Sequence, residues 1–209
     1  MAFLMMSMMF IMLPRASVSA HRIADVLETE PEIHDPQNPK HFKDPKGKLE
    51  FKNVCFAYPG AEDNVLTDID FTALPGQTTA FIGPTGSGKS TVANLIPRFY
   101  DVSCGSVVID GLDVREVTRH ELRDQIGYVP QKAVLFSGTI ASNLRLGDEE
   151  ASDATLNSAA EGAQAMEFIS KNAKGLDASI SQGGANVSGG QKQRLSIARA
   201  LVKDPNIYV

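Results

Sequence analysis

The chain has 209 residues, of which 43% are hydrophobic and 22% are charged, a composition ordinary for a globular domain. This length allows one sizeable core, or one domain with an appendage. The formal net charge of −5 gives no support to a general nucleic-acid surface, which would need a basic excess. Cys55 and Cys104 lie far apart in the sequence without a neighbouring His or Cys, so we expect free thiols in a reducing compartment rather than a zinc cluster or a redox pair.

The first thirteen residues form an apolar segment, and six of the seven methionines lie within its first twelve positions. The segment is shorter than the roughly 20 apolar residues that a membrane crossing needs. A signal peptide, a buried core helix and the end of a transmembrane helix are all open interpretations. Residues 18–20 resemble a cleavage site, but no Lys or Arg precedes the apolar run. Arg15, His21 and Arg22 follow it directly, which favours a helix emerging on the cytoplasmic side.

A proline-rich stretch divides the chain. Loose helical spacing over residues 16–27 predicts that the first helix continues to about residue 30. Residues 31–47 hold four prolines and several charges, so we expect an extended linker and a domain boundary there. Residues 48–209 would then form the main domain.

The first part of this domain has the pattern of strands. Apolar alternation predicts a strand over residues 48–58, with an irregularity at Asn53, and a partner strand over residues 65–74. A short strand over residues 78–82 leads into a glycine-rich loop, and helical spacing follows over residues 90–100. The next predicted elements are a hairpin, a helix and a strand, at residues 106–114, 118–125 and 126–129.

The second half changes to a helical pattern. Three segments rich in Ala, Leu and Glu predict a helical subdomain inserted into the α/β core, at residues 138–146, 152–163 and 165–172. A last helix is expected over residues 190–202, and Asp204-Pro205 would end it. Residues 207–209 begin a buried strand.

The glycine-rich loop, Gly-Pro-Thr-Gly-Ser-Gly-Lys-Ser at residues 83–90, has the pattern of a phosphate-binding loop. Its glycines allow backbone N–H groups to converge on phosphate oxygens, and the helix that follows directs its positive end at the same anion. Lys89 would neutralise β and γ oxygens, and the Ser90 hydroxyl would bind Mg²⁺. Because a strand precedes the loop and a helix follows it, a chance glycine turn is the weaker interpretation.

A second glycine cluster, at residues 183–194, also opens a helix. Ser188 and the paired glycines after it would form another anion site at the helix N-terminus. Taken alone, an ordinary Ser-capped helix is the simpler interpretation. Arg194 and Arg199 on this helix are expected to be structural charges rather than ligands.

Three motifs together resemble the ATP-binding cassette family. They are the loop at residues 83–91, Tyr-Val-Pro-Gln at residues 128–131 and Val-Ser-Gly-Gly-Gln at residues 187–191, which match its Walker A loop, Q-loop and signature in type, order and spacing. The resemblance covers nearly all of residues 48–209. It implies an α/β fold, a P-loop NTPase core with an antiparallel β subdomain and an inserted α-helical subdomain, preceded by the end of a transmembrane helix.

The resemblance also implies roles for single residues. Tyr58 lies where the family stacks an aromatic ring on adenine, and Gln131 where a glutamine reaches Mg²⁺ and the attacking water. Gln131 is therefore the catalytic candidate and, with Ser90, a metal ligand, while residues 181–184 match an exporter loop that touches the membrane domain. The candidates for binding ATP are Tyr58, Gly83, Pro84, Thr85, Gly86, Ser87, Gly88, Lys89, Ser90, Thr91, Val187, Ser188, Gly189, Gly190 and Gln191.

Partners follow from the same resemblance. In the family, ATP lies between the Walker A loop of one domain and the signature of another, so a second nucleotide-binding domain is expected, in a homo- or heterodimer. The layout of residues 1–30, 31–47 and 48–209 looks like the exporter arrangement, in which the last transmembrane helix leads into the ATPase domain. That implies a cell-membrane protein whose transmembrane domain is on the same polypeptide, with residues 31–209 cytoplasmic and no nucleic acid bound. A signal peptide is disfavoured, since a secreted protein would meet no cytosolic ATP.

Hydrolysis is a separate expectation. The family's next motif is an apolar strand ending in Asp, followed by a catalytic carboxylate and later a His. Residues 207–209 look like the start of that strand, and the sequence stops before either acid, so we expect ATP binding with poor hydrolysis. Two alternatives stay open: a non-catalytic regulatory subunit of a heterodimeric transporter and, less favoured, a soluble cassette protein of DNA repair or translation.

Overall fold

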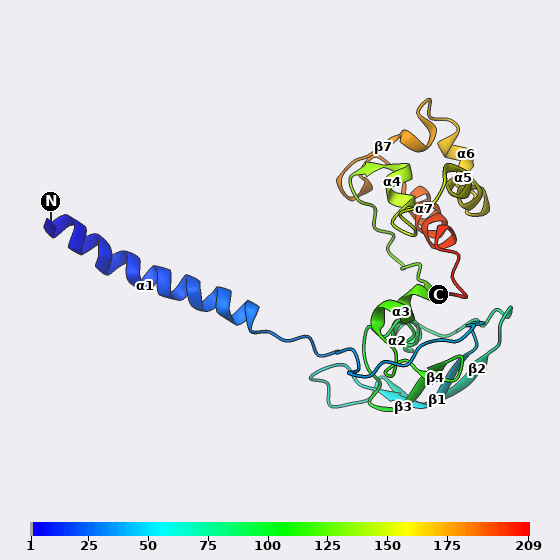
Figure 1. Ribbon diagram of the computed structural model, residues 1–209, viewed down its shortest axis with the longest axis horizontal. Helices are drawn as coiled ribbons and strands as arrows, with labels where there is room; N and C mark the ends of the chain where they lie inside the picture. Colours follow the sequence, from blue (N-terminus) through cyan, green and yellow to red (C-terminus); the bar gives the residue numbers. More distant parts are fainter. Residues whose placement is uncertain (1) are drawn as a thin grey trace. The chain divides into compact units, whose positions relative to one another are not determined.

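The computed structural model describes residues 2–209 and forms two compact units, of which the first ends at His34 and the second is Asp35–Val209 (Figure 1). The first unit consists mainly of one helix, α1 (Ala2–Leu27), which continues through Pro14. Many apolar side chains of this helix are exposed, among them Phe3, Phe10, Ile11, Val26 and Leu27. Within residues 2–209, no helix combines the length and the apolar character needed to cross a membrane.

An antiparallel sheet of four strands, in the order β2-β1-β3-β4, begins the second unit (Figure 1). The central strand β1 (Leu49–Phe56) pairs with β2 (Leu66–Ala73) on one side and with β3 (Cys104–Ile109) on the other. A turn then brings β4 (Leu112–Asp113) back along β3. The antiparallel subdomain and its hairpin are therefore confirmed.

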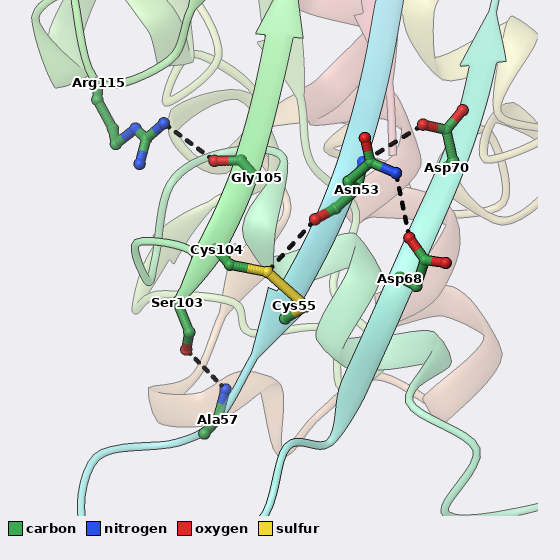
Figure 2. The surroundings of a disulfide bond; sticks show 9 residues. All are labelled: Asn53, Cys55, Ala57, Asp68, Asp70, Ser103, Cys104, Gly105 and Arg115. Carbon is green, nitrogen blue, oxygen red and sulfur yellow. Dashed lines mark hydrogen bonds between the residues drawn. A yellow bond between two sulfur atoms is a disulfide. The ribbon is translucent and has the colours of Figure 1, made fainter.

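The predicted irregularity at Asn53 is also confirmed. Asn53 adopts a φ of 48°, and the register of β1 against both neighbours shifts there. Its N–H and side-chain amide donate to Asp70 and Asp68 of β2 (Figure 2). Opposite the bulge lies Gly105, where a Cβ would approach the carbonyl oxygens of Lys52 and Asn53 to 2.3 Å, so the extra residue of β1 requires a glycine in β3.

Cys55 and Cys104 form a disulfide bond, so the prediction of two free thiols is wrong (Figure 2). The two residues are direct cross-strand partners of β1 and β3, and their Cα atoms are 4.9 Å apart. That separation lies within the range that a disulfide requires. Distance along the chain was misleading because antiparallel pairing brings residues 49 positions apart to the same level of the sheet.

The sheet shares one hydrophobic core with α2 (Lys89–Leu95) and α3 (Arg119–Asp124). Thr118 caps α3 by accepting a bond from the N–H of Glu121. The next strand in the sequence after α3, β5 (Ile126–Gly127), pairs in parallel with β8 (Ile207–Tyr208). The chain segment between these two strands holds the predicted helices, so the helical subdomain is an insertion.

Residues 78–82 do not form the predicted strand. They have no sheet partner in the part of the chain that the structure describes, and a strand needs a neighbour for its backbone N–H and C=O groups. Ile82 is 95% exposed, while the ring of Phe81 packs edge-on against Phe71. The prediction of a strand was wrong here, because an apolar pattern does not show whether a neighbouring strand is available for pairing.

The helices of the inserted segment lie together in one group (Figure 1). They share a hydrophobic core of their own. This helical subdomain contains α4 (Ile140–Leu144), α5 (Asp153–Gly162), α6 (Met166–Ile169) and α7 (Gly189–Val202), with two 3-10 turns, Gly175–Asp177 and Gln182–Gly184. A short antiparallel pair joins β6 (Gly138–Thr139) to β7 (Ser179–Ile180). Leu144, Leu156 and Leu195 are completely buried where these helices meet.

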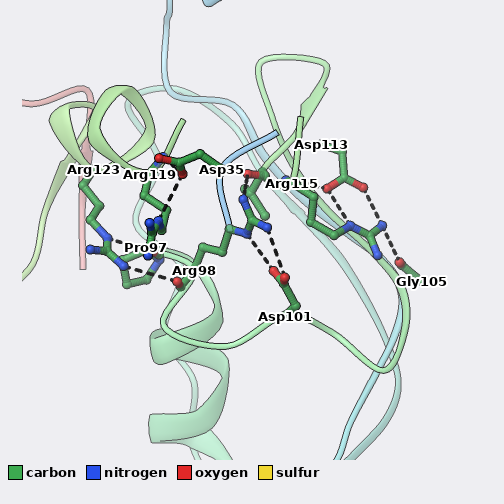
Figure 3. Close-up of polar contacts among 10 residues, drawn as sticks. Asp35, Pro97, Arg98, Asp101, Gly105, Asp113, Arg115, Arg119 and Arg123 are labelled. Atoms are coloured by element: carbon green, nitrogen blue, oxygen red, sulfur yellow. Dashed lines mark hydrogen bonds and ion pairs between the residues drawn. The ribbon is translucent and has the colours of Figure 1, made fainter. Parts of the chain in front are cut away.

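From Asp35 to Gly47, the proline-rich segment that precedes β1 is extended and is the first part of the second unit. Oδ1 of Asp35 accepts bonds from the N–H and Nε of Arg119, at 2.9 and 3.0 Å (Figure 3). Farther along, Lys40 Nζ pairs with Glu116, and Phe42 donates its N–H to Glu121. Polar contacts therefore fix this segment to α3 and the residues before it.

Candidate functional site

A pocket of about 400 Å³ lies over the glycine-rich loop. Its lining consists of Val65, residues 85–91 and Gln131. The structure thus brings Gln131, predicted from a separate motif, to the same pocket as the predicted phosphate loop.

The loop ends at the start of α2. Gly88 is the N-cap with a φ of 83°, and a Cβ there would lie 2.6 Å from a methyl carbon of Leu66. Both the left-handed backbone and the close approach of β2 therefore require glycine. Gly88 has no side chain to cap the helix, so the first N–H groups of α2 are available to an anion in the pocket.

Lys89 lies across the loop. Its Nζ donates to the carbonyl oxygens of Gly83 and Pro84, at 2.9 and 2.6 Å, and to Oγ of Ser87 at 3.2 Å. Among the described residues that line the pocket, Lys89 is the only charged one, and the others offer hydroxyl, amide or backbone groups. A positive charge among N–H and O–H donors favours an anionic ligand.

Tyr58 lies beside this loop, two residues after the end of β1. Its hydroxyl oxygen is 3.0 Å from Oγ1 of Thr91 in the first turn of α2. Its ring contacts Phe56 and Tyr100 edge-on, with centroid distances of 4.8 and 5.2 Å. The predicted aromatic platform and the phosphate loop are therefore adjacent.

The second glycine cluster forms the start of α7. Ser188 is the N-cap, and Ser188 and Gln191 exchange bonds as a capping box: the N–H of Gln191 donates to Ser188 Oγ at 3.3 Å, and the N–H of Ser188 donates to Gln191 Oε1 at 2.9 Å. Gly189 and Gly190 are exposed. None of the residues 187–191 lines the pocket over the phosphate loop.

Arg194 and Arg199 have the structural roles expected of them. Nη1 of Arg194 pairs with Glu167 at 3.1 Å and donates to the carbonyl oxygen of Gln164. The guanidinium of Arg199 donates to the backbone and side-chain oxygens of Asn143 and to the carbonyl oxygen of Val134. Burial lowers the pKa of Arg199.

The profile of the ABC transporter family matches residues 66–209. This chain belongs to the ABC transporter family. An uncharacterized ABC transporter ATP-binding protein of Mycobacterium tuberculosis is 48% identical over 213 residues, which cover 100% of this chain and 36% of the relative. The beta-(1-->2)glucan export ATP-binding/permease protein NdvA of Bradyrhizobium diazoefficiens is 47% identical over 185 residues, which cover 88% of this chain and 30% of that protein.

A solved structure of a bacterial Atm1-family ABC exporter with ATP bound has the same fold. Its TM-score is 0.88 at 36% identity, and the match covers 96% of this chain and 35% of that chain. The predicted resemblance to the exporter type and the predicted α/β fold are confirmed. The chain spans about a third of the length of these relatives.

Sequence reasoning missed the residues that hold the segment from Val134 to Thr139, which follows Gln131. The side chain of Asn143, 1% exposed, accepts from the N–H of Phe136 and donates to the carbonyl oxygens of Phe136 and Thr139, each at 2.9 Å. Arg199 binds Asn143 from α7, 56 residues away in the sequence. An Asn within an apolar helical segment was the available signal, since a buried amide needs partners.

Proposed function

We propose that this chain is the ATP-binding domain through which an exporter couples ATP binding and hydrolysis to the transport of a substrate across a membrane. The observation that carries the proposal is the pocket over residues 85–91, where Lys89, uncapped helix N–H groups and Gln131 converge. Its donor set suits a triphosphate. Tyr58 lies at its side with a ring large enough to cover adenine.

The residues present fit Mg²⁺-ATP. In this proposal, Lys89 exchanges its bonds to Gly83 and Pro84 for phosphate oxygens, and the N–H groups of the loop bind the remaining oxygens. The hydroxyl of Ser90 and the amide oxygen of Gln131 are hard oxygen ligands of the kind that Mg²⁺ prefers. When bound, Mg²⁺ neutralises charge between the phosphates.

A second nucleotide-binding domain, in a homo- or heterodimer, is part of the proposal. Val187, Ser188 and the N–H groups of Gly189 and Gly190 would complete the ATP site of that partner, with Gln191 holding Ser188 in place through the capping box. Two observations support this arrangement: the start of α7 is exposed, and it lies outside the pocket of its own chain.

The membrane is the other proposed partner. We assign residues 1–30 to the end of the last transmembrane helix and its extension, residues 31–47 to the linker and residues 48–209 to the ABC domain. Exposed apolar side chains in the first half of α1, among them Phe3, Met8, Phe10 and Ile11, support this assignment, since water does not favour such a surface. The transmembrane domain would belong to the same polypeptide, with residues 31–209 on the cytoplasmic side of the cell membrane.

Hydrolysis by the 209-residue polypeptide should be poor. Among the described residues, no Asp or Glu lines the pocket, so Gln131 alone would orient water there. Phosphate release from Mg²⁺-ATP, measured beside ATP binding, tests this. We expect binding with very slow release, whereas turnover of about 1 s⁻¹ or faster would contradict it. The same lining favours, as a second candidate, a non-catalytic regulatory subunit, which would raise the turnover of an active partner.

A further inference from the structure

Tyr100 contacts the proposed adenine platform. Its ring lies edge-on to that of Tyr58, with centroids 5.2 Å apart and planes at 89°, and its centroid is 5.5 Å from that of Phe56. Phe56 is itself buried and edge-on to Tyr58. Three aromatic rings therefore form one cluster at the end of β1, and the hydroxyl of Tyr58 connects this cluster to Thr91 beside the phosphate loop.

The backbone that carries Tyr100 is fixed from two sides (Figure 3). Arg98 is 4% exposed with a φ of 54°, and its Nε and Nη2 bind both carboxylate oxygens of Asp101, at 2.7 and 3.1 Å. From α3, Arg123 donates to the carbonyl oxygens of Pro97 and Arg98. A bidentate pair and two carbonyl contacts leave this turn little freedom, so the position of Tyr100 is defined.

Tyr58 has two contacts with the chain segment that runs from the start of α2 to Tyr100. Its hydroxyl meets Oγ1 of Thr91 at the start of α2, while its ring meets Tyr100 beyond the end of α2. A hydroxyl contact alone lets the ring turn about its long axis. An edge-to-face contact defines the plane of the ring, and a base can stack only on a ring whose plane faces it.

We propose that Tyr100 is a positioning residue that sets the plane of the Tyr58 ring for adenine. The inference rests on the proposed role of Tyr58 in ATP binding. Tyr100 itself would contact Tyr58 and not the nucleotide. Its contribution should therefore appear in the recognition of the base and not in the binding of the phosphates.

Calorimetric titration of the full 209-residue chain in detergent, with Mg²⁺-ATP and with Mg²⁺-tripolyphosphate, separates recognition of the base from binding of the phosphates. For Tyr100→Leu we expect the Kd for ATP to rise about fivefold, the size of one aromatic pair contact, with no change for tripolyphosphate. Tyr100→Phe keeps the ring and should bind both ligands like the original chain. If the Leu variant does not fold, Tyr100→Met, also without a ring, is measured by the same criterion.

Tyr58→Ala distinguishes the failure of this inference from the failure of the proposed function. If Tyr58→Ala weakens ATP binding but the ring-less Tyr100 variants do not, Tyr100 has no positioning role. If a Tyr100 variant weakens ATP and tripolyphosphate equally, its role is general stability and the inference is overturned. If Tyr58→Ala leaves ATP binding unchanged, the adenine platform is wrong and the role of Tyr100 is overturned with it.

Discussion

The backbone N–H of Phe42 donates to Oε1 of Glu121 over 2.8 Å, across 79 residues of sequence. The other carboxylate oxygen of Glu121 lies 2.8 Å from Nδ1 of His41. Partial burial raises the pKa of Glu121, but the bonds from Phe42 and His41 outweigh it, so the pKa lies below its ordinary value of 4.5. The segment before β1 is thus bound to α3 by the ionised form of one carboxyl.

This bond predicts that acid weakens the attachment of the segment before β1 to α3. Because the folded pKa of Glu121 is depressed, its contribution to stability is present above pH 4.5 and is lost as the pH falls through the folded value. We expect Glu121→Gln to lower the Tm at pH 7 and to have little effect at a pH below that window. Glu149→Gln, at an exposed position, is the control. An equal loss in Tm for Glu121→Gln at both pH values would contradict the role of the ionised carboxyl.

The disulfide predicts sensitivity to reduction. Reducing Cys55–Cys104 releases a loop with a sequence separation of 49, which should lower the free energy of unfolding by about 4 kcal/mol on the chain-entropy estimate. Urea unfolding with and without a phosphine reductant measures the difference. Cys104→Ser should match the reduced protein and should not respond to the reductant. Coincident unfolding curves for the original chain in both conditions would show that the bond contributes nothing.

Asn143 should be among the residues most sensitive to substitution. Asn143→Leu keeps the side-chain volume but removes the oxygen that accepts bonds from the N–H of Phe136 and from Nη2 of Arg199. We expect the free energy of unfolding to fall by about 2–3 kcal/mol. Asn64→Leu, at an exposed position between β1 and β2, should change stability by less than about 0.5 kcal/mol. Chemical unfolding measures both variants, and equal stabilities would exclude the role of Asn143 in holding the segment from Phe136 to Thr139.

Ser188 should contribute to stability through its cap. Ser188→Ala removes the acceptor of the Gln191 N–H and should cost about 1 kcal/mol, whereas Ser188→Gly should cost only a few tenths. Ser158→Ala, at an exposed position within α5, is the control for the loss of a hydroxyl. Thermal unfolding of the three variants checks the order. Because Ser188 lies outside the phosphate pocket, ATP affinity of the single chain should not follow these changes.

Local patterns predicted most of the fold. The irregularity at Asn53, the helix that follows Thr118 and the glycine-rich loop before α2 each depend on a few neighbouring residues, and each was found where the sequence indicated. Contacts that depend on which strands pair could not be predicted from neighbouring residues in the sequence. The Cys55–Cys104 bond depends on strand register, and the failure of residues 78–82 to form a strand depends on the absence of a neighbour among the residues described.

The candidate site also combines residues that local motifs indicate with residues whose contacts form only on folding. The motifs indicated Lys89, Tyr58 and Gln131 individually, and the fold then brought all three to one region. Tyr100 and Asn143 carry no motif, because their roles come from contacts made only after folding. A single sequence gives no signal for such contacts beyond an aromatic ring or an amide in an apolar setting.

Calorimetric titration of Mg²⁺-ATP into the 209-residue chain and its Lys89→Ala variant tests the phosphate loop most directly. Loss of the Nζ charge from the pocket should raise the Kd about tenfold or more, since bonds to charged groups are worth about 1.5–3 kcal/mol. Lys174→Ala removes an exposed lysine elsewhere and should bind ATP like the original chain. Full ATP affinity in Lys89→Ala would contradict the assignment of the loop as the ATP site.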